Sequence, residues 1–279
     1  MEKILNKEIV QKIKDYIEAE LKAQNIANKI IRDDVFSILD KHCIILYYPL
    51  ENESIKGYHI SRHIGEETKD FVYINTAKTM EVQVFAAAHE LGHILKIDKR
   101  IAEDFDIEEN ERQFEKIVSR FAAELLMPEK DFFEKFDHCK SLLKVKSNKI
   151  SVRDIISIGI YLMNEYLVEF EAIIKRFYEL EIISCESCDV LMKINDEEQF
   201  QDKLNSIVKA NNFTRLCNIT NKKSISNLEE NISNALKTKL VDDEEIESFL
   251  DLFDLDLASI CEDEDISGIS ESINLLNCE

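Results

Sequence analysis

The residues best suited to chemistry in this sequence form a short motif, His89-Glu90-Leu91-Gly92-His93, within a stretch of helical periodicity. Histidines four residues apart project from the same face of a helix. Two neutral imidazoles at this spacing can each place a nitrogen about 2.0–2.1 Å from one Zn²⁺, which leaves positions for a carboxylate and a water. Glu90 is expected to face that water and to act as a general base. The motif therefore predicts metal-assisted hydrolysis of an amide bond.

The surroundings of the motif argue against a solvated pair of surface histidines. A chain of this composition is expected to contain such a motif by chance only about 0.01–0.02 times. The neighbouring residues leave little of the helix polar: Ala86, Ala87, Ala88, Leu91, Gly92, Ile94 and Leu95. Histidines placed among so many apolar side chains need a partner, and a metal ion is the partner that the spacing favours.

The next helical stretch, which ends at Pro128, offers candidates for a third ligand. On a helical wheel, Glu111 lies about 50° and Glu115 about 90° from the centre of the apolar stripe. Glu124 points away from that stripe. The wheel alone leaves both Glu111 and Glu115 open as ligands.

These motifs together resemble the ImmA/IrrE family of zinc metallopeptidases. Phe85 and Ala88 precede the motif His89-Glu90-Leu91-Gly92-His93. The following helix reads Glu115-x-x-Val118-Ser119-x-Phe121-Ala122-Ala123-x-Leu125-Leu126-Met127-Pro128. The family has E-x-x-A-N-x-F-A-x-x-L-L-M-P here, with its Glu as a zinc ligand. The resemblance implies one Zn²⁺ held by His89, His93 and Glu115, with Glu90 as the general base.

The resemblance is specific over residues 85–128 and looser from about 43 to 184. Val118 and Ser119 replace the usual Ala-Asn pair, and Lys96-Ile97 replaces a Leu-His pair that often follows the zinc helix. We expect neither departure to contact a ligand. Residues 168–183 are similar to the family's Val-x-x-x-Ala-x-x-x-Arg-Leu element, and we interpret them as core or linker rather than as a DNA-recognition helix.

Members of the family cleave helix-turn-helix repressors, so the resemblance implies a zinc endopeptidase that relieves repression in a mobile element or a stress response. The alternative is a zinc-containing binding module that sequesters a basic regulatory protein without cutting it. Glu90 argues against the alternative, because a protein that only binds has no chemical use for that carboxylate.

The hydrophobic periodicity predicts an α+β fold that is predominantly helical, with a small sheet. The resemblance implies that this sheet packs on the zinc-binding helix in a gluzincin-like arrangement. Two amphipathic helices are expected within residues 3–41. Three short strands are expected over 43–48, 57–61 and 70–75. Helices are expected over 80–96, 107–127, 128–137, 151–165, 168–181, 196–210, 226–239 and 242–254, with Ser226 and Glu229 as a capping box.

The chain divides by composition into a peptidase-like part and an acidic part. We expect a domain over 1–184, with N-terminal helices in 1–41 and a catalytic core over 43–184, followed by an acidic helical region over 185–279. The chain carries a net charge of −21, and residues 240–279 contain 14 acidic residues and no Lys or Arg. That acidic region either docks the basic face of a repressor or keeps the chain soluble, and we favour solubility.

Composition also excludes several classes of function. The 5 glycines lie too far apart for a GxGxxG or GxxxxGK nucleotide loop. The negative charge disfavours direct binding of nucleic acid, and the longest apolar stretch is far shorter than the roughly 20 residues that a membrane helix needs. A charged N-terminus and 7 irregularly spaced cysteines indicate reduced thiols in the cytoplasm.

Several other reactive side chains have a structural and a functional interpretation. Cys185 and Cys188, with Cys217, are read as incidental thiols, the alternative being a second metal site or a redox pair. His138 is read as a surface residue, the alternative being a hydrogen-bond donor to the transition state. Ordinary sheet packing is favoured for Tyr58, His59, His63 and Tyr73, although an edge strand there could bind an extended substrate.

Overall fold

The computed structural model describes residues 5–27, 30–52, 54–64, 67–108, 110–145, 150–228, 232 and 242–255. Its helices in the first half are α1 (Lys7–Ala23), α2 (Asp34–Leu39), α3 (Met80–Ile94), α4 (Ile97–Phe105), α5 (Glu111–Leu126) and α6 (Glu129–Leu142). They are followed by α7 (Val152–Tyr166), α8 (Phe170–Glu179), α9 (Cys185–Asn195), α10 (Glu198–Ala210) and α12 (Asp243–Leu252). The strands are β1 (Ile44–Tyr48), β2 (Gly57–Ile64), β3 (Glu67–Asn75) and β4 (Ser224–Ile225).

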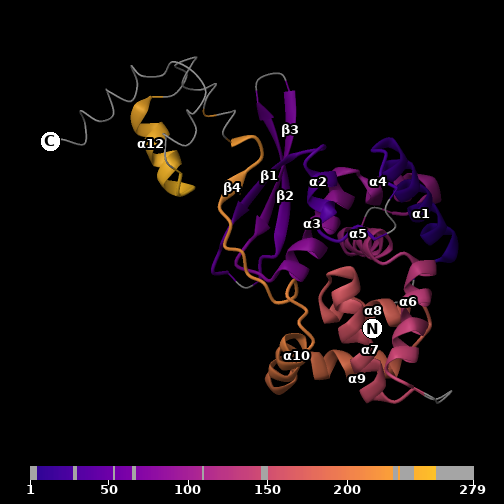
Figure 1. The fold of residues 1–279 in the computed structure, drawn as a ribbon. Helices are drawn as coiled ribbons and strands as arrows, with labels where there is room; N and C mark the ends of the chain where they lie inside the picture. Colours follow the sequence, from indigo (N-terminus) through magenta and orange to yellow (C-terminus); the bar gives the residue numbers. More distant parts are fainter. Residues whose placement is uncertain are drawn as a thin grey trace.

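The four strands form one mixed sheet in the order β2-β3-β1-β4. β1 is parallel to β3, whereas β2 and β4 are antiparallel to their neighbours. Helices α3 and α5 lie on one side of the sheet and α12 lies on the other, while α6 to α10 gather below (Figure 1). This arrangement confirms the predicted α+β fold with a dominant helical part.

Most of the predicted elements are present, with two instructive differences. The stretch predicted as one helix over 107–127 begins only at Glu111, because the Asn110 side chain caps it by accepting a hydrogen bond from the Gln113 N–H at 3.3 Å. Residues before it form the unpredicted helix α4, which begins after Lys96 adopts a left-handed backbone with φ of 54°. That turn folds α4 back against α3 and α5, in a segment between the helices predicted over 80–96 and 107–127. Helix α9 was also not predicted.

The helix that carries the His-Glu-x-x-His motif is packed tightly against α5. A Cβ atom added to Gly92 would lie 2.8 Å from Val118 Cγ1 and 3.1 Å from Phe121 Cδ1. Only glycine allows the two helices to approach this closely without displacing those side chains. Gly92 thus sets the spacing between α3 and the helix that carries Glu115.

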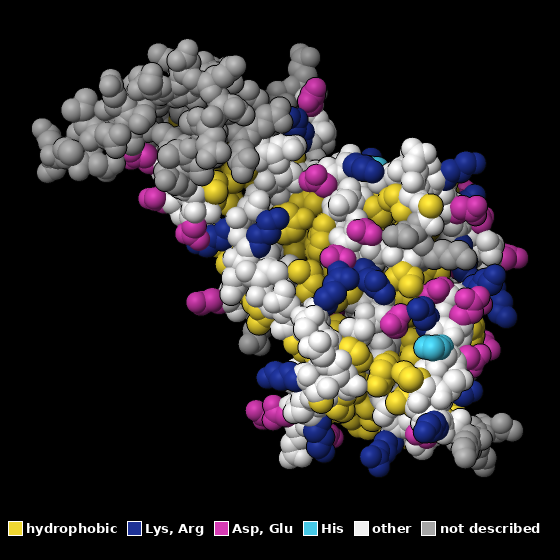
Figure 2. Space-filling model, viewed as in Figure 1, with side chains coloured by type: hydrophobic (Ala, Val, Ile, Leu, Met, Phe, Trp, Pro, Cys, Tyr) yellow, Lys and Arg dark blue, Asp and Glu magenta, His cyan; other side chains and the backbone are white. Residues whose placement is uncertain are grey.

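The main hydrophobic core extends beyond the peptidase-like segment. Residues from α1 to α8 share one cluster with Cys188, Leu191, Phe200, Leu204, Val208 and Leu216. A second, smaller cluster forms around Leu228, Ile232, Ile246, Leu250 and Phe253, and packs on Leu46 and Ile225 of the sheet. Hydrophobic side chains gather over the strands on the face seen in Figure 2, where acidic and basic side chains intermix around them.

Residues 217–226 bind the later part of the chain to the sheet. The Met80 N–H donates to the Asn218 carbonyl at 2.8 Å, and β4 pairs with Leu46 and Tyr47 of β1. The Ile45 N–H donates to the hydroxyl of Ser226, the residue expected to cap a helix over 226–239. Most of that expected helix lies outside the described residues. Helix α12 agrees with the prediction over 242–254 and begins with a capping box of Asp242 and Glu245.

Glu124, which the wheel turns away from the apolar stripe, is nevertheless buried. Arg176 of α8 donates to both of its carboxylate oxygens at 2.9 and 2.8 Å, and Arg120 donates at 3.0 Å. The wheel assumed one buried face, whereas α1 also packs on α5 and the Arg176 side chain of α8 reaches Glu124. Arg176 is fully buried, which agrees with the interpretation of its segment as core. Among the described residues, we find no helix with the length and apolar character needed to cross a bilayer.

Candidate metal centre

Three side chains from two helices converge at the C-terminal half of α3. His89 Nε2 lies 3.1 Å from Glu115 Oε2 and 3.2 Å from His93 Nε2, and His93 Nε2 lies 3.3 Å from Glu115 Oε1. All three ligand atoms lie within 4.8 Å of one another, and within the described residues no other His, Cys, Asp or Glu group meets this criterion. Two imidazole nitrogens and one carboxylate match the ligand set that Zn²⁺ prefers in catalytic sites.

The geometry distinguishes between the two glutamates that the helical wheel left open. Glu115 stands in the second turn of α5, opposite both histidines, and is half exposed. Glu111, one turn earlier, is exposed and does not join the cluster. Burial lowers the pKa of His89, which favours the neutral imidazole that binds a metal ion. The residues present therefore fit a divalent metal.

Each histidine also has a polar contact on its other ring nitrogen. Asp98 Oδ2, at the start of α4, lies 3.9 Å from His93 Nδ1, and its carboxylate is buried. Ser119 Oγ lies 3.4 Å from His89 Nδ1. The expectation that Ser119 contacts no ligand is wrong, because α5 turns the face with Ser119 toward α3. Sequence reasoning also missed Asp98, for which the only signal was a carboxylate five residues after the second histidine.

Glu90 is buried beside this cluster, at 7% exposure. Burial raises its pKa to about 7, an effect that His93 counteracts and Glu115 reinforces. A carboxylate with a pKa near neutrality can both take and return a proton at physiological pH. Glu90 thus has the environment that a general base needs.

A family model described as the IrrE N-terminal-like domain, a peptidase family, matches residues 41–178. This range contains the first three strands and all four residues just described. Residues 41–178 belong to the ImmA/IrrE family of metallopeptidases. The resemblance predicted from the motifs is confirmed, and the family supports a metallopeptidase role. A search among curated proteins finds no match to this chain.

Strand β2 lies beside the metal cluster of this ImmA/IrrE-family domain and forms one edge of the sheet. Gly57 faces α3, since a Cβ added there would lie 3.4 Å from Ala86 Cβ. His59, two residues along, shares that face, and its ring lies 6.1 Å from the His93 ring, centroid to centroid, with the planes 17° apart. The side chain of His59 therefore borders the candidate metal centre.

Other reactive side chains of this peptidase stand away from the cluster. His138 is exposed on α6, as expected for a surface residue. Cys188 is buried, and burial raises the pKa of its thiol to about 11. The five cysteines in the described part of the chain are free thiols. Cys185, Cys188 and Cys217 are not in the candidate metal-binding group found among the described residues, and their interpretation as structural or incidental thiols stays a prediction.

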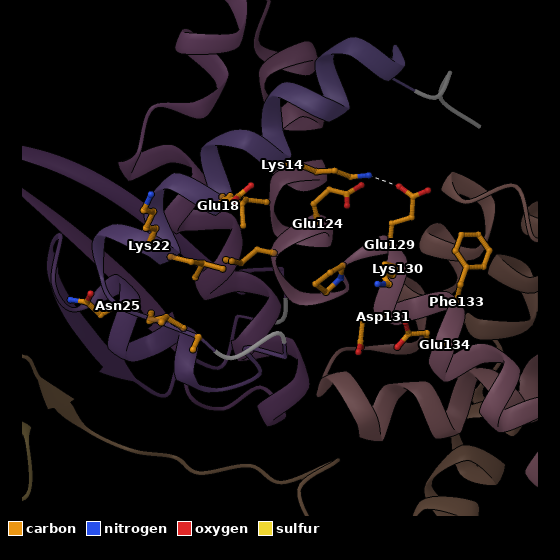
Figure 3. A pocket seen from close by; sticks show the side chains of 16 residues that line it. Lys14, Glu18, Lys22, Asn25, Glu124, Glu129, Lys130, Asp131, Phe133 and Glu134 are labelled. Atoms are coloured by element: carbon orange, nitrogen blue, oxygen red, sulfur yellow. Dashed lines mark hydrogen bonds and ion pairs between the residues drawn. The ribbon is translucent and has the colours of Figure 1, made fainter.

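A cavity of about 1040 Å³ lies elsewhere in this peptidase, between α1 and the junction of α5 with α6 (Figure 3). Its wall includes Glu124, nine residues beyond Glu115 and therefore about 13 Å farther along the axis of α5. Lys14 and Glu129 form an ion pair across it. None of the clustered side chains lines this cavity, so it is separate from the candidate metal centre.

Proposed function

We propose that this protein is a zinc-dependent endopeptidase in the cytoplasm that cleaves a helix-turn-helix transcriptional repressor. The observation that carries the proposal is the convergence of His89, His93 and Glu115 next to the buried carboxylate of Glu90. The alternative ligand Glu111 is not part of this cluster. We assign the three clustered residues as ligands of one Zn²⁺ and Glu90 as the general base.

The chemistry divides between the metal and the chain. A Zn²⁺ ion bound there would act as a Lewis acid on the scissile carbonyl and lower the pKa of water. Glu90 takes a proton from the attacking water and transfers it to the leaving amine, so that its carboxylate is regenerated. Burial excludes bulk water from this carboxylate and keeps its pKa near the pH at which both transfers are efficient.

The substrate class follows from the family and from the shape of the site. Family members act on helix-turn-helix repressors, and we extend this substrate class to the present chain. The exposed edge of β2 runs beside the cluster and offers unpaired backbone groups to an extended peptide segment. Free thiols in the described residues agree with the proposed reducing compartment.

The test is incubation of the purified, zinc-loaded protein with the helix-turn-helix protein encoded next to it. We expect defined fragments of the repressor, which disappear when a chelator removes the metal and return when Zn²⁺ is restored. Stable co-elution of the two intact proteins would instead support the alternative function, a module that sequesters its partner. Intact, unbound repressor under all conditions would contradict both functions.

Asp98 provides a prediction about metal binding. Its carboxylate lies 3.9 Å from His93 Nδ1, at ion-pair rather than hydrogen-bond distance, and favours the orientation of that imidazole with Nε2 toward the cluster. Such contacts typically contribute about 10–100-fold to metal affinity. We expect Asp98→Asn to weaken Zn²⁺ binding by about this factor, measured by competition with a chromophoric chelator. Asp106→Asn, at the other end of α4, serves as the control and should leave the affinity unchanged, whereas equal affinities for all three proteins would contradict the role of Asp98.

A further inference from the structure

The proposed hydrolysis requires a hydrogen-bond donor that the four assigned residues do not supply. When water attacks the scissile carbonyl, negative charge develops on its oxygen, and a hydrogen-bond donor aimed at that oxygen lowers the barrier. Glu90 and Glu115 are carboxylates and His89 and His93 are assigned to the metal. None of these four side chains is therefore free to donate. His138, whose alternative role from the sequence is such a donor, is exposed on α6 and is not among the residues around the cluster.

His59 stands where such a donor is needed. It lies on β2, on the face of the sheet that looks toward α3, and its ring borders the ring of His93 at 6.1 Å between centroids. Its side chain is 28% exposed, so a ligand beside the metal cluster can reach it. β2 is an edge strand, and a peptide along this edge would pass directly beside the imidazole.

The polar surroundings of His59 leave a ring N–H available. Ser61 Oγ lies 3.4 Å from Nε2 and Asp70 Oδ1 lies 3.7 Å from it, and both contacts are long. The Ser61 hydroxyl donates to Asp70, so toward the imidazole its oxygen can only accept, and the Nε2–H keeps this long contact until a stronger acceptor is beside it. Asp98 and Lys99 of α4 are the further charged groups that act on the ring.

We propose that His59 is a catalytic residue, whose imidazole N–H donates a hydrogen bond to the oxygen of the scissile carbonyl as negative charge develops on it. The proposal rests on the proposed endopeptidase function and adds a residue outside the His-Glu-x-x-His motif. His59 forms no covalent bond to the substrate and keeps its proton throughout. Its effect is to stabilise the tetrahedral state relative to the planar amide.

The experiment compares zinc-loaded parent protein, His59→Phe and the control His63→Phe. His63 lies on the same strand and the same face, farther from the metal cluster. The first readout is binding of an Ala-Ala phosphinic pseudo-dipeptide, whose tetrahedral phosphinate mimics the charged state, measured by calorimetry. We expect His59→Phe to bind it at least about tenfold more weakly than the parent, with zinc content unchanged, and His63→Phe to match the parent.

The second readout is repressor cleavage, where removal of one donor is expected to lower kcat by about 10²–10³-fold with KM little changed. Equal phosphinate affinity of parent and His59→Phe, no binding by the parent, or loss of zinc from the variant would overturn the proposal. His59→Leu is a second donor-free variant should Phe perturb β2. If no repressor is cut but phosphinate binding still depends on His59, the substrate is wrong and the role of His59 stands.

Discussion

Glu90→Gln is expected to abolish peptide-bond cleavage while the protein keeps its zinc. The amide has nearly the same size as the carboxylate but has no basic oxygen, so it cannot take a proton from water. Loss of a general base typically costs about 10²–10⁴-fold in rate. Zinc content should remain at the parent level because Glu90 does not belong to the cluster of candidate ligands. The measurements are the rate of repressor cleavage and the metal content of the same samples.

Two variants of α5 serve as controls for that result. Glu111→Gln changes an exposed carboxylate outside the cluster and should cleave at the parent rate. Glu115→Gln should lose both zinc and activity, which separates a ligand from a base. If Glu90→Gln still cuts the repressor at a comparable rate, another group takes the proton and the mechanism is wrong.

The pH dependence of cleavage by the parent protein should also originate from the carboxylate of Glu90. Burial raises the pKa of Glu90 to about 7 in the absence of a metal, and a nearby dication stabilises the charged carboxylate and brings that pKa down. The base works when it is deprotonated. We therefore expect cleavage to fall as the pH drops through an acid limb below about 7.

Arg176→Met is expected to lower the free energy of unfolding by about 3–5 kcal/mol, since the buried carboxylate of Glu124 loses two hydrogen bonds and is left with Arg120 as its charged hydrogen-bond partner. Glu124 is 3% exposed and receives two hydrogen bonds from Arg176. The Met127 carbonyl, which accepts from Arg176 Nε and Nη2 at 3.1 and 2.8 Å, loses both donors as well. Chemical denaturation of the two proteins measures the difference.

Neighbouring substitutions define what this loss means. Lys175→Met, on the same helix, removes a surface pair with Glu171 and should cost less than about 1 kcal/mol. The double variant Arg176→Met/Glu124→Met removes the Arg176–Glu124 pair and leaves Arg120 its pair with Glu179. It should recover part of the stability, because a hydrophobic pair can replace a buried ion pair. A loss for Arg176→Met no greater than that for Lys175→Met would contradict the importance of the pair.

Acidification should reduce the difference in the free energy of unfolding between the parent and Arg176→Met. Burial by itself would raise the pKa of Glu124, but Arg176 and Arg120 outweigh it and hold the pKa below its ordinary value of 4.5. The stability that comes from a lowered carboxyl pKa is present above the unfolded value and is lost as the pH falls through the folded one. The parent should therefore lose this contribution below about pH 4.5, and the deficit of Arg176→Met should be smaller there than at pH 7.

The sequence determined the chemistry of the site because that information is local. Two histidines one helical turn apart share a face wherever the helix lies, and an adjacent Glu follows from the same geometry. The periodicity of the chain likewise predicted most helices and three strands. Burial of one face repeats hydrophobic residues about every 3.6 residues in a helix and every 2 residues in a strand. The family resemblance rests on residues within one stretch of 44 positions, from 85 to 128.

The tertiary structure decided what depends on residues that are distant in sequence or on the direction of a turn. Glu115 and Glu111 have similar positions on a wheel, and only the close packing of α3 on α5 at Gly92 places Glu115 opposite the histidines. The left-handed turn at Lys96 carries Asp98 to His93, and strand pairing carries His59 beside that same ring. Hydrophobic periodicity indicates which side of a helix or strand is buried, but it does not indicate which neighbouring element covers that side.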